Sequence, residues 1–321
     1  MRLKHSLLIF VLGILIGMGI SPLAKVKPYQ PFLSPIPLTL AEEVMWEDVG
    51  ANQILGARTA DQEIERQENI SGLVNQQDQD LSQANLYLVS QPPSTQSNHK
   101  SVTSSKVTVA IFGDSMVDTM GTGLPYLKSV LSQYYPQVQF NLLNYGIGAQ
   151  NIESGLSRFG ETHSYQDRNY PAITSSGANI IIIESFAYNP PAGGEAGLDT
   201  QWQTLSQMVN KAAAAGAKVM ILATIAPSRT QFGQGPGGIS WTRDEAWQQA
   251  ELINKYLANA VRLSNTLKVP VVDAYHVSLL SDGEGNPVFI NSNDHIHPSV
   301  AGHQFVAGLI AQKIFDLDLI K

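Results

Sequence analysis

The chain has 321 residues, of which 43% are apolar, carries a formal net charge of −7 and contains no cysteine. Without cysteine, disulfides, thiol catalysis, a lipid-modified cysteine anchor and thiolate-ligated zinc are excluded. Four of the twenty Lys and Arg residues lie in the first 27 positions, which hold no Asp or Glu, so the remainder combines 16 basic with 27 acidic residues. An acidic body without a basic stripe argues against nucleic acid as a partner.

The first 24 residues predict an export segment. A basic start, MRLKH, precedes the apolar run Leu7–Ile20, which is the pattern of a signal peptide or a membrane anchor. The uncharged span from Ser6 to Ala24 would reach about 28 Å as a helix, just enough to cross the core of a bilayer. Cleavage after Ala24 would place Pro22 where a small residue is preferred, which favours an uncleaved anchor over a cleaved signal; a core helix of a soluble protein is the remaining alternative. We expect a protein of the cell envelope, membrane-anchored outside the cytoplasm, or a secreted one.

Residues 25–105 predict a low-complexity linker that is partly helical. Prolines at positions 28, 31, 35 and 37 break any early helix. Residues 40–68 have loosely spaced apolar positions that favour some helix, whereas residues 69–105 are rich in Gln, Ser and Asn and low in charge, as in flexible spacers. This linker would separate the membrane segment from a folded domain at 106–321.

From Lys106 onward, short apolar runs alternate with helical patterns. The predicted strands are Val107–Phe112, Val138–Asn144, Asn179–Glu184, Lys218–Thr224 and Val269–Asp273. The predicted helices are Met116–Tyr135, Asn151–Phe159, Gln201–Ala215, Thr242–Leu267 and a last one from Pro298 to about Leu317. Strands that are each followed by a helix predict a parallel sheet covered by helices on both faces. We expect one α/β domain of the three-layer αβα, flavodoxin-like type, with five parallel strands in the order 2-1-3-4-5.

The first predicted strand runs directly into Gly113-Asp114-Ser115. A short uninterrupted apolar run closed by Gly-Asp-Ser indicates a buried strand that ends in a tight turn before a helix. In a parallel sheet this turn lies at the carboxyl edge, where ligands bind. Ser115 is therefore a candidate nucleophile, and the alternative is a serine that only caps the following helix.

A serine becomes a good nucleophile when a base takes its proton and a third group orients the base. Asp294 and His297 lie three residues apart in the loop after the fifth predicted strand, so the carboxylate can reach the imidazole of its own loop. That loop shares the carboxyl edge with Ser115. Two alternatives stay open: His295 as the base, or a metal held by His295, His297 and Asp294.

Ester hydrolysis also needs hydrogen-bond donors directed at the oxyanion of the tetrahedral intermediate. The turn Asn144–Ala149, after the second strand, consists mostly of small residues whose N–H groups can approach a ligand closely. Ser185–Asn189, after the third strand, ends in a side-chain amide. In the expected strand order both turns border Ser115.

Four blocks of this sequence resemble those of the SGNH/GDSL hydrolases: GDSM at Gly113–Met116, NYGIG at Asn144–Gly148, Asn189, and DHIHP at Asp294–Pro298. The resemblance covers residues 106–317. The third block departs from the family pattern Gly-x-Asn-Asp, because this chain has ESFAYNP at 184–190. In the second block Ala149 stands where the family has a glycine.

Carried over by position, the resemblance implies Ser115 as nucleophile, His297 as general base and Asp294 as the group that orients it. It also implies an oxyanion hole made by the Ser115 N–H, the N–H of Gly148 or Ala149, and the Asn189 side-chain amide. No cofactor and no metal are implied.

The leading hypothesis is an exported serine ester hydrolase that works through an acyl-enzyme on a small acyl ester. Its substrate would be a small molecule or a glycan ester, such as O-acetyl groups of an envelope glycan, or a lipid ester. One alternative is an envelope acyltransferase with the same Ser-His-Asp triad, and another is a non-catalytic envelope-binding protein. The N-terminal segment predicts the membrane as a partner; the sequence does not indicate an oligomeric state.

Overall fold

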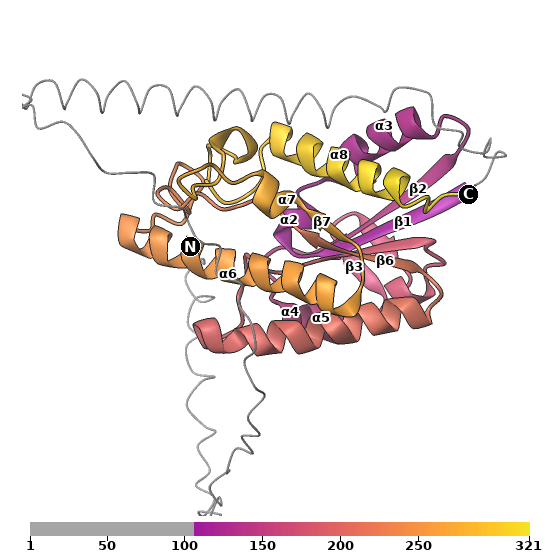
Figure 1. Cartoon of the computed structure of the whole chain (residues 1–321), viewed down its shortest axis with the longest axis horizontal. Coiled ribbons are helices and arrows are strands. Elements are labelled where there is room, and N and C mark those ends of the chain that lie inside the picture. Colours follow the sequence, from indigo (N-terminus) through magenta and orange to yellow (C-terminus); the bar gives the residue numbers. More distant parts are fainter. Residues whose placement is uncertain (1–105) are drawn as a thin grey trace, which may run out of the picture. The chain divides into compact units, whose positions relative to one another are not determined.

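The computed structural model of the chain describes residues 106–321 (Figure 1). The predicted export segment at 1–24 and the predicted linker at 25–105 lie outside the described residues and stay predictions. Within residues 106–321, none of the helices combines the length and the apolar character needed to span a bilayer.

A five-stranded parallel sheet forms the centre of the domain, in the order β2-β1-β5-β6-β7. In chain order, β1, β2, β5, β6 and β7 correspond to the five predicted strands. The expected order 2-1-3-4-5 is therefore confirmed. Successive residues of β1 face opposite sides of the sheet: Val109 and Ile111 pack in one apolar core, Ala110 and Phe112 in the other. The bounds are β1 Lys106–Gly113, β2 Gln139–Gly146, β5 Ile180–Glu184, β6 Lys218–Ala223 and β7 Val271–Asp273.

Helices cover both faces of this sheet, as expected for a three-layer αβα domain. Figure 1 shows α3 and α8 side by side on one face, and α4, α5 and α6 on the other. The α-helices are α2 Ser115–Asp118, α3 Pro125–Tyr134, α4 Ile152–Arg158, α5 Gly197–Ala214, α6 Arg243–Leu267, α7 Ala274–Val277 and α8 Val300–Asp316. Three short 3₁₀ helices are η1 Ile173–Ser175, η2 Gly194–Ala196 and η3 Pro287–Phe289.

Three predicted helices differ from the structure. The helix expected at Gln201–Ala215 begins earlier, at Gly197. The single helix expected at Met116–Tyr135 is divided into α2 and α3, because Gly121 and Gly123 have φ values of 83° and 73°, outside the helical region. The last helix begins at Val300 and not at Pro298. Pro298 forms an antiparallel bridge with Ile290, and the Ser299 side chain accepts a hydrogen bond from the Gly302 N–H, which caps α8.

A two-stranded antiparallel hairpin, β3 (His163–Tyr165) and β4 (Arg168–Tyr170), was not expected from the sequence. It lies in the connection between α4 and β5. Arg168 is buried and pairs with Asp118 of α2 at 2.5 Å. The hairpin is therefore attached to the short helix that begins with Ser115.

Candidate active site

Ser115 is the first residue of α2, directly after the end of β1. The side chain of the preceding residue, Asp114, caps this helix by accepting a hydrogen bond from the Met116 N–H at 2.8 Å. A Cβ atom on Gly113 would lie 2.4 Å from Val117 Cγ2 and 2.7 Å from Glu184 Cβ. Only glycine lets this turn pack so closely against α2 and β5. The turn places Ser115 in the wall of an open cleft of about 920 Å³.

Asp294 and His297 form a hydrogen-bonded pair in the loop before α8. The His297 Nδ1 lies 2.7 Å from Asp294 Oδ2, while Asp294 Oδ1 accepts hydrogen bonds from the N–H groups of Ile296 (2.8 Å) and His297 (3.1 Å). Both carboxylate oxygens are thus occupied, and the ring is held by Nδ1 with Nε2 left for another partner. Burial alone would raise the pKa of Asp294, but these hydrogen bonds and the His297 charge outweigh it and lower the pKa below its usual value.

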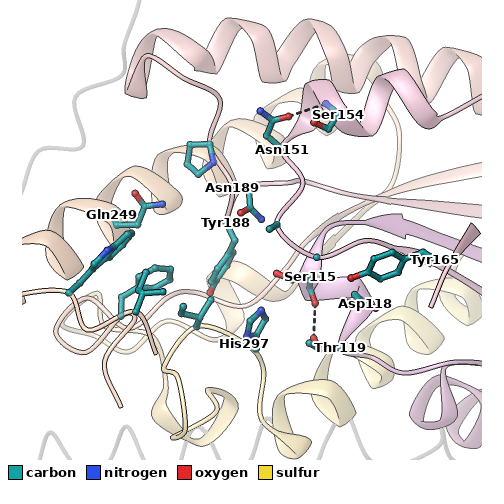
Figure 2. A pocket seen from close by; sticks show the side chains of 17 residues that line it. Ser115, Asp118, Thr119, Asn151, Ser154, Tyr165, Tyr188, Asn189, Gln249 and His297 are labelled. Carbon is teal, nitrogen blue, oxygen red and sulfur yellow. Dashed lines mark hydrogen bonds between the residues drawn. The ribbon is translucent and has the colours of Figure 1, made fainter. Parts of the chain in front are cut away.

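Ser115 and His297 line the same cleft. Figure 2 shows both side chains in this cleft. Within residues 106–321 no hydrogen bond joins the Ser115 hydroxyl to the His297 ring. Such contacts are commonly loose in ligand-free enzymes and tighten when substrate binds. The structure thus brings the three predicted triad residues to one site, with the aspartate–histidine contact formed.

The predicted oxyanion-hole residues Gly148, Ala149 and Asn189 all line this cleft together with Ser115. Among the described residues, the backbone N–H groups of Ser115, Gly148 and Ala149 donate to no protein acceptor. The Asn189 amide donates one hydrogen to Asp114 Oδ2 at 2.8 Å. An amide nitrogen has two hydrogens, so one remains for a ligand.

Three residues in the loops around Ser115 have left-handed backbone conformations although they are not glycine. Ala149 follows β2 with φ 57°, Phe186 follows β5 with φ 54°, and His295 precedes His297 with φ 52°. Such strain is concentrated at functional sites in proteins. The position of Ala149 explains why a glycine suits the family at this point.

His295 contacts the backbone of a neighbouring loop, whereas His297 contacts Asp294. Its Nδ1 lies 2.6 Å from the carbonyl oxygen of Gln234, in the loop after β6, and the Gly237 N–H donates to the Asn293 carbonyl at 2.8 Å. A Cβ atom on Gly235, where φ is 111°, would lie 2.7 Å from the Asn293 carbonyl oxygen, so this close approach of the two backbones requires glycine. The glycine-rich loop is thus fastened to the loop that carries the aspartate–histidine pair. In the described part of the chain, no group of three or more His, Cys, Asp or Glu side chains is arranged to hold a metal ion.

The cleft has two chemically different walls. The apolar wall includes Tyr188, Phe232, Ile239 and Trp241, and the Phe232 ring lies 5.9 Å from that of Tyr188 and 5.7 Å from that of Trp241. The polar wall includes Asp118, Thr119 and Tyr165; Figure 2 shows Asp118 and Tyr165 on the side of Ser115 away from Tyr188. The cleft therefore has room for unlike groups on the two sides of a reacting ester.

A model of the GDSL-like Lipase/Acylhydrolase family matches residues 111–305. The chain belongs to this family. The matched range includes Ser115, Gly148, Ala149, Asn189, Asp294 and His297.

Several solved structures are similar to this GDSL-like acylhydrolase at low sequence identity. A lipase/acylhydrolase from Enterococcus faecalis has a TM-score of 0.49 at 17% identity and covers 66% of this chain and 96% of its own. A GDSL-like lipase from Bacteroides thetaiotaomicron has a TM-score of 0.47 at 19% identity, with 65% and 88% covered. A variant of an acetyl xylan esterase from Geobacillus stearothermophilus has a TM-score of 0.43 at 16% identity, with 66% and 96% covered. The comparison with curated proteins gave no match.

Two buried carboxyl groups, Asp114 and Glu184, lie next to the turn that carries Ser115. Burial raises the pKa of Asp114 to about 6, against the opposing effect of hydrogen bonds from Met116 and Asn189. Burial and the nearby Asp114 charge raise the pKa of Glu184 well above its usual range. Glu184 accepts hydrogen bonds from the Ser185 hydroxyl at 2.7 Å and the Phe186 N–H at 2.8 Å. Asp114 and Glu184 thus join the turn at Ser115 to the loop that carries Asn189.

The sequence did not single out Asp118, Tyr165, Ile239 or Trp241 as cleft residues. Tyr165 reaches the cleft through the unpredicted hairpin, whose alternating aromatic and polar residues at 163–170 were the available signal. The glycine-rich loop at residues 231–238 contributes Phe232 to the apolar wall.

Proposed function

We propose that this GDSL-like acylhydrolase cleaves small acyl esters with Ser115 as nucleophile, His297 as general base and Asp294 as the group that orients His297. The carrying observation is the 2.7 Å contact between Asp294 and the His297 Nδ1 in a loop that lines the Ser115 cleft. Because Nδ1 is bound to the carboxylate, the lone pair of a neutral ring lies on Nε2, the atom that can accept the serine proton.

In the acylation step His297 Nε2 takes the proton of Ser115 Oγ while Oγ attacks the ester carbonyl carbon. The carbonyl oxygen becomes an oxyanion, which accepts hydrogen bonds from the Ser115 N–H, the Gly148 or Ala149 N–H, and the Asn189 amide. The tetrahedral intermediate then expels the alcohol, which receives the proton from His297. Asp294 stabilises the imidazolium while it exists.

In the deacylation step a water molecule replaces the alcohol. His297 takes a proton from water as the hydroxide oxygen attacks the acyl carbon, and then returns it to Ser115 Oγ as the acid leaves. The balance is one ester and one water consumed, one acid and one alcohol released, with no cofactor used.

The substrate class in this proposal is an ester of a short acyl group. The molecule whose hydroxyl carries this acyl group is either an envelope glycan or a lipid. The site of action is outside the cytoplasm. The apolar run Leu7–Ile20 behind a basic start supports export. A fusion of residues 1–105 to a reporter that is active only outside the cytoplasm tests this part: an inactive reporter would contradict it.

The mechanism is tested with the full-length protein and 4-nitrophenyl acetate. Ser115→Ala is expected to lower kcat on the order of a millionfold, as nucleophile loss does in such triads. The matched control is Ser157→Ala, an exposed serine of α4 outside the cleft, which is expected to keep wild-type turnover. Mass spectrometry after treatment with a fluorophosphonate is expected to find the adduct on Ser115. Turnover that survives Ser115→Ala, or an adduct on another residue only, would contradict the mechanism.

A further inference from the structure

The polar wall of the cleft is built on the hairpin β3–β4 and helix α2. Arg168 of the hairpin, whose side chain is 1% exposed, pairs with Asp118 Oδ1 at 2.5 Å. The Thr122 hydroxyl contacts the two carboxylate oxygens of Asp167 at 3.1 and 3.2 Å. These two contacts attach the hairpin at both its turn and its second strand to the segment that follows Ser115. The hairpin is therefore fixed relative to the nucleophile.

Tyr165, the last residue of β3, extends from the attached hairpin and lines the cleft. The Arg168 guanidinium carbon lies 5.2 Å from the centre of the Tyr165 ring, a cation–π distance that holds the ring in place. Figure 2 shows the Tyr165 side chain extending from the hairpin with its hydroxyl directed toward Ser115. Within residues 106–321 this hydroxyl has no hydrogen-bond partner.

Asp118 supplies a second polar atom at the same place. Its Oδ1 is bound by Arg168, whereas Oδ2 accepts no hydrogen bond from the described part of the chain. A Cβ atom on Gly148 would lie 3.5 Å from Tyr165 Oη and 3.7 Å from Asp118 Oδ2. Both atoms therefore border Gly148, in the turn that offers N–H groups to the oxyanion. Glycine at 148 leaves the space between them open.

We propose that Tyr165 Oη and Asp118 Oδ2 form a subsite for the hydroxyl groups of a sugar whose neighbouring hydroxyl carries the acyl group. This inference rests on the proposed function and names its substrate class as partly acylated carbohydrate. An ionised carboxylate oxygen accepts hydrogen bonds and donates none, so it matches a hydroxyl donor; a tyrosine hydroxyl both donates and accepts. Adjacent hydroxyls of a pyranose offer this combination.

Tyr165 Oη and Asp118 Oδ2 also disfavour lipid esters and anionic esters. An alkyl chain in this subsite would remove water from the Asp118 carboxylate without replacing its hydrogen bonds, which is unfavourable. An ionised phosphate or carboxylate group has only acceptor oxygens, so it offers no donor to the Asp118 Oδ2 atom. The subsite thus discriminates against lipid esters and against anionic esters, and a sugar ester satisfies it.

The test compares two esters that have the same acyl group and a six-membered ring in the alcohol: mono-O-acetylated methyl glucopyranosides and cyclohexyl acetate. The full-length wild type is expected to show at least a tenfold higher kcat/KM for the sugar esters. Tyr165→Phe removes one hydroxyl and is expected to lower the ratio of the two kcat/KM values about five- to tenfold, which is the worth of one hydrogen bond. The control Ser164→Ala removes an exposed hydroxyl from the neighbouring residue of the same strand and is expected to keep the wild-type ratio.

The following outcomes would contradict the subsite, and the last of them would also contradict the proposed function. A ratio unchanged by Tyr165→Phe, an equal fall on both esters, or a wild type that prefers cyclohexyl acetate would overturn the subsite. If the wild type turns over 4-nitrophenyl acetate and is labelled at Ser115 but leaves both ring esters intact, the subsite fails and the proposed function stands. If the wild type hydrolyses none of the three esters and Ser115 is not labelled, both proposals fail.

Discussion

His163, the first residue of the hairpin that carries Tyr165, makes the stability of the protein depend on pH. It is 4% exposed, and its ring packs against those of Tyr145 at 5.1 Å and Tyr170 at 5.7 Å. Among the described residues neither ring nitrogen has a hydrogen-bond partner. Burial, and then the positive charges of Arg158 and Arg168, lower its pKa from 6.5 to about 4. The native structure therefore holds this ring neutral.

The sign and size of the effect follow from this shift. A folded pKa below the unfolded value means that the unfolded chain binds more protons between pH 6.5 and pH 4, so stability present above pH 6.5 is lost as the pH falls. The full loss is about 3 kcal/mol, and about 2 kcal/mol of it has occurred at pH 5. Against a typical total stability of about 5–15 kcal/mol, this loss is measurable.

His163→Phe is expected to remove this pH dependence. The phenyl ring has no nitrogen to leave unsatisfied and no proton to bind. The variant is therefore expected to be at least as stable as wild type at pH 7.5. Its free energy of unfolding relative to wild type is expected to rise by a further amount of about 2 kcal/mol between pH 7.5 and pH 5. Urea unfolding at both pH values measures the free energies. Other titrating groups, such as His303 and Asp114, are common to both proteins and cancel in the comparison.

A control and a clear contrary outcome accompany this experiment. Asn169→Ala changes an exposed side chain of β4 that binds no proton, so it is expected to keep the wild-type loss between pH 7.5 and pH 5. If His163→Phe and wild type lose the same free energy over this range, the titration of His163 does not contribute and the reasoning is wrong.

Three further predictions concern the site and its support. Ala149→Gly relieves a left-handed alanine and is expected to raise the free energy of unfolding by up to about 1 kcal/mol in urea unfolding, with activity kept because the N–H remains; a loss of stability would contradict the strain. Asp294→Asn is expected to lower kcat by up to about 10⁴ with a small change in KM, because the His297 ring loses its orienting carboxylate; steady-state kinetics with unchanged kcat would exclude that role. Arg168→Met leaves Asp118 without its buried partner and is expected to destabilise the protein by about 3 kcal/mol, and a neutral result in urea unfolding would show that the hairpin is held by other contacts.

The fold was predictable because the strand signals are local and unbroken. Ile180–Glu184 is buried along its whole length, so the chain shows a continuous apolar run that needs no partner to be recognised. The alternation with helices then leaves few topologies for a parallel sheet. The division of the helix after Ser115 depended on backbone angles at Gly121 and Gly123, which composition indicates but does not fix.

The site was predictable in proportion to how local its contacts are. Asp294 and His297 are three residues apart, so their hydrogen bond is a property of one short loop and could be expected from the spacing. The polar wall depends on the pairing of Asp118 with Arg168, 50 residues apart in sequence. The sequence around Asp118 or around Arg168 does not indicate that these two side chains pair. Tyr165 therefore reached the cleft through a tertiary contact that the sequence alone did not reveal.

The hydrogen bond from His295 to Gln234 limits how this enzyme can be altered. The loop that carries His297 contacts the glycine-rich loop that carries Phe232, so a change of backbone that widens the cleft at Phe232 is expected to move the His297 ring as well. On the opposite side, the pair of Arg168 and Asp118 attaches the hairpin to α2, so this pair has to be kept. Engineering for new alcohols should therefore begin at Tyr165, whose side chain can be exchanged without breaking that pair.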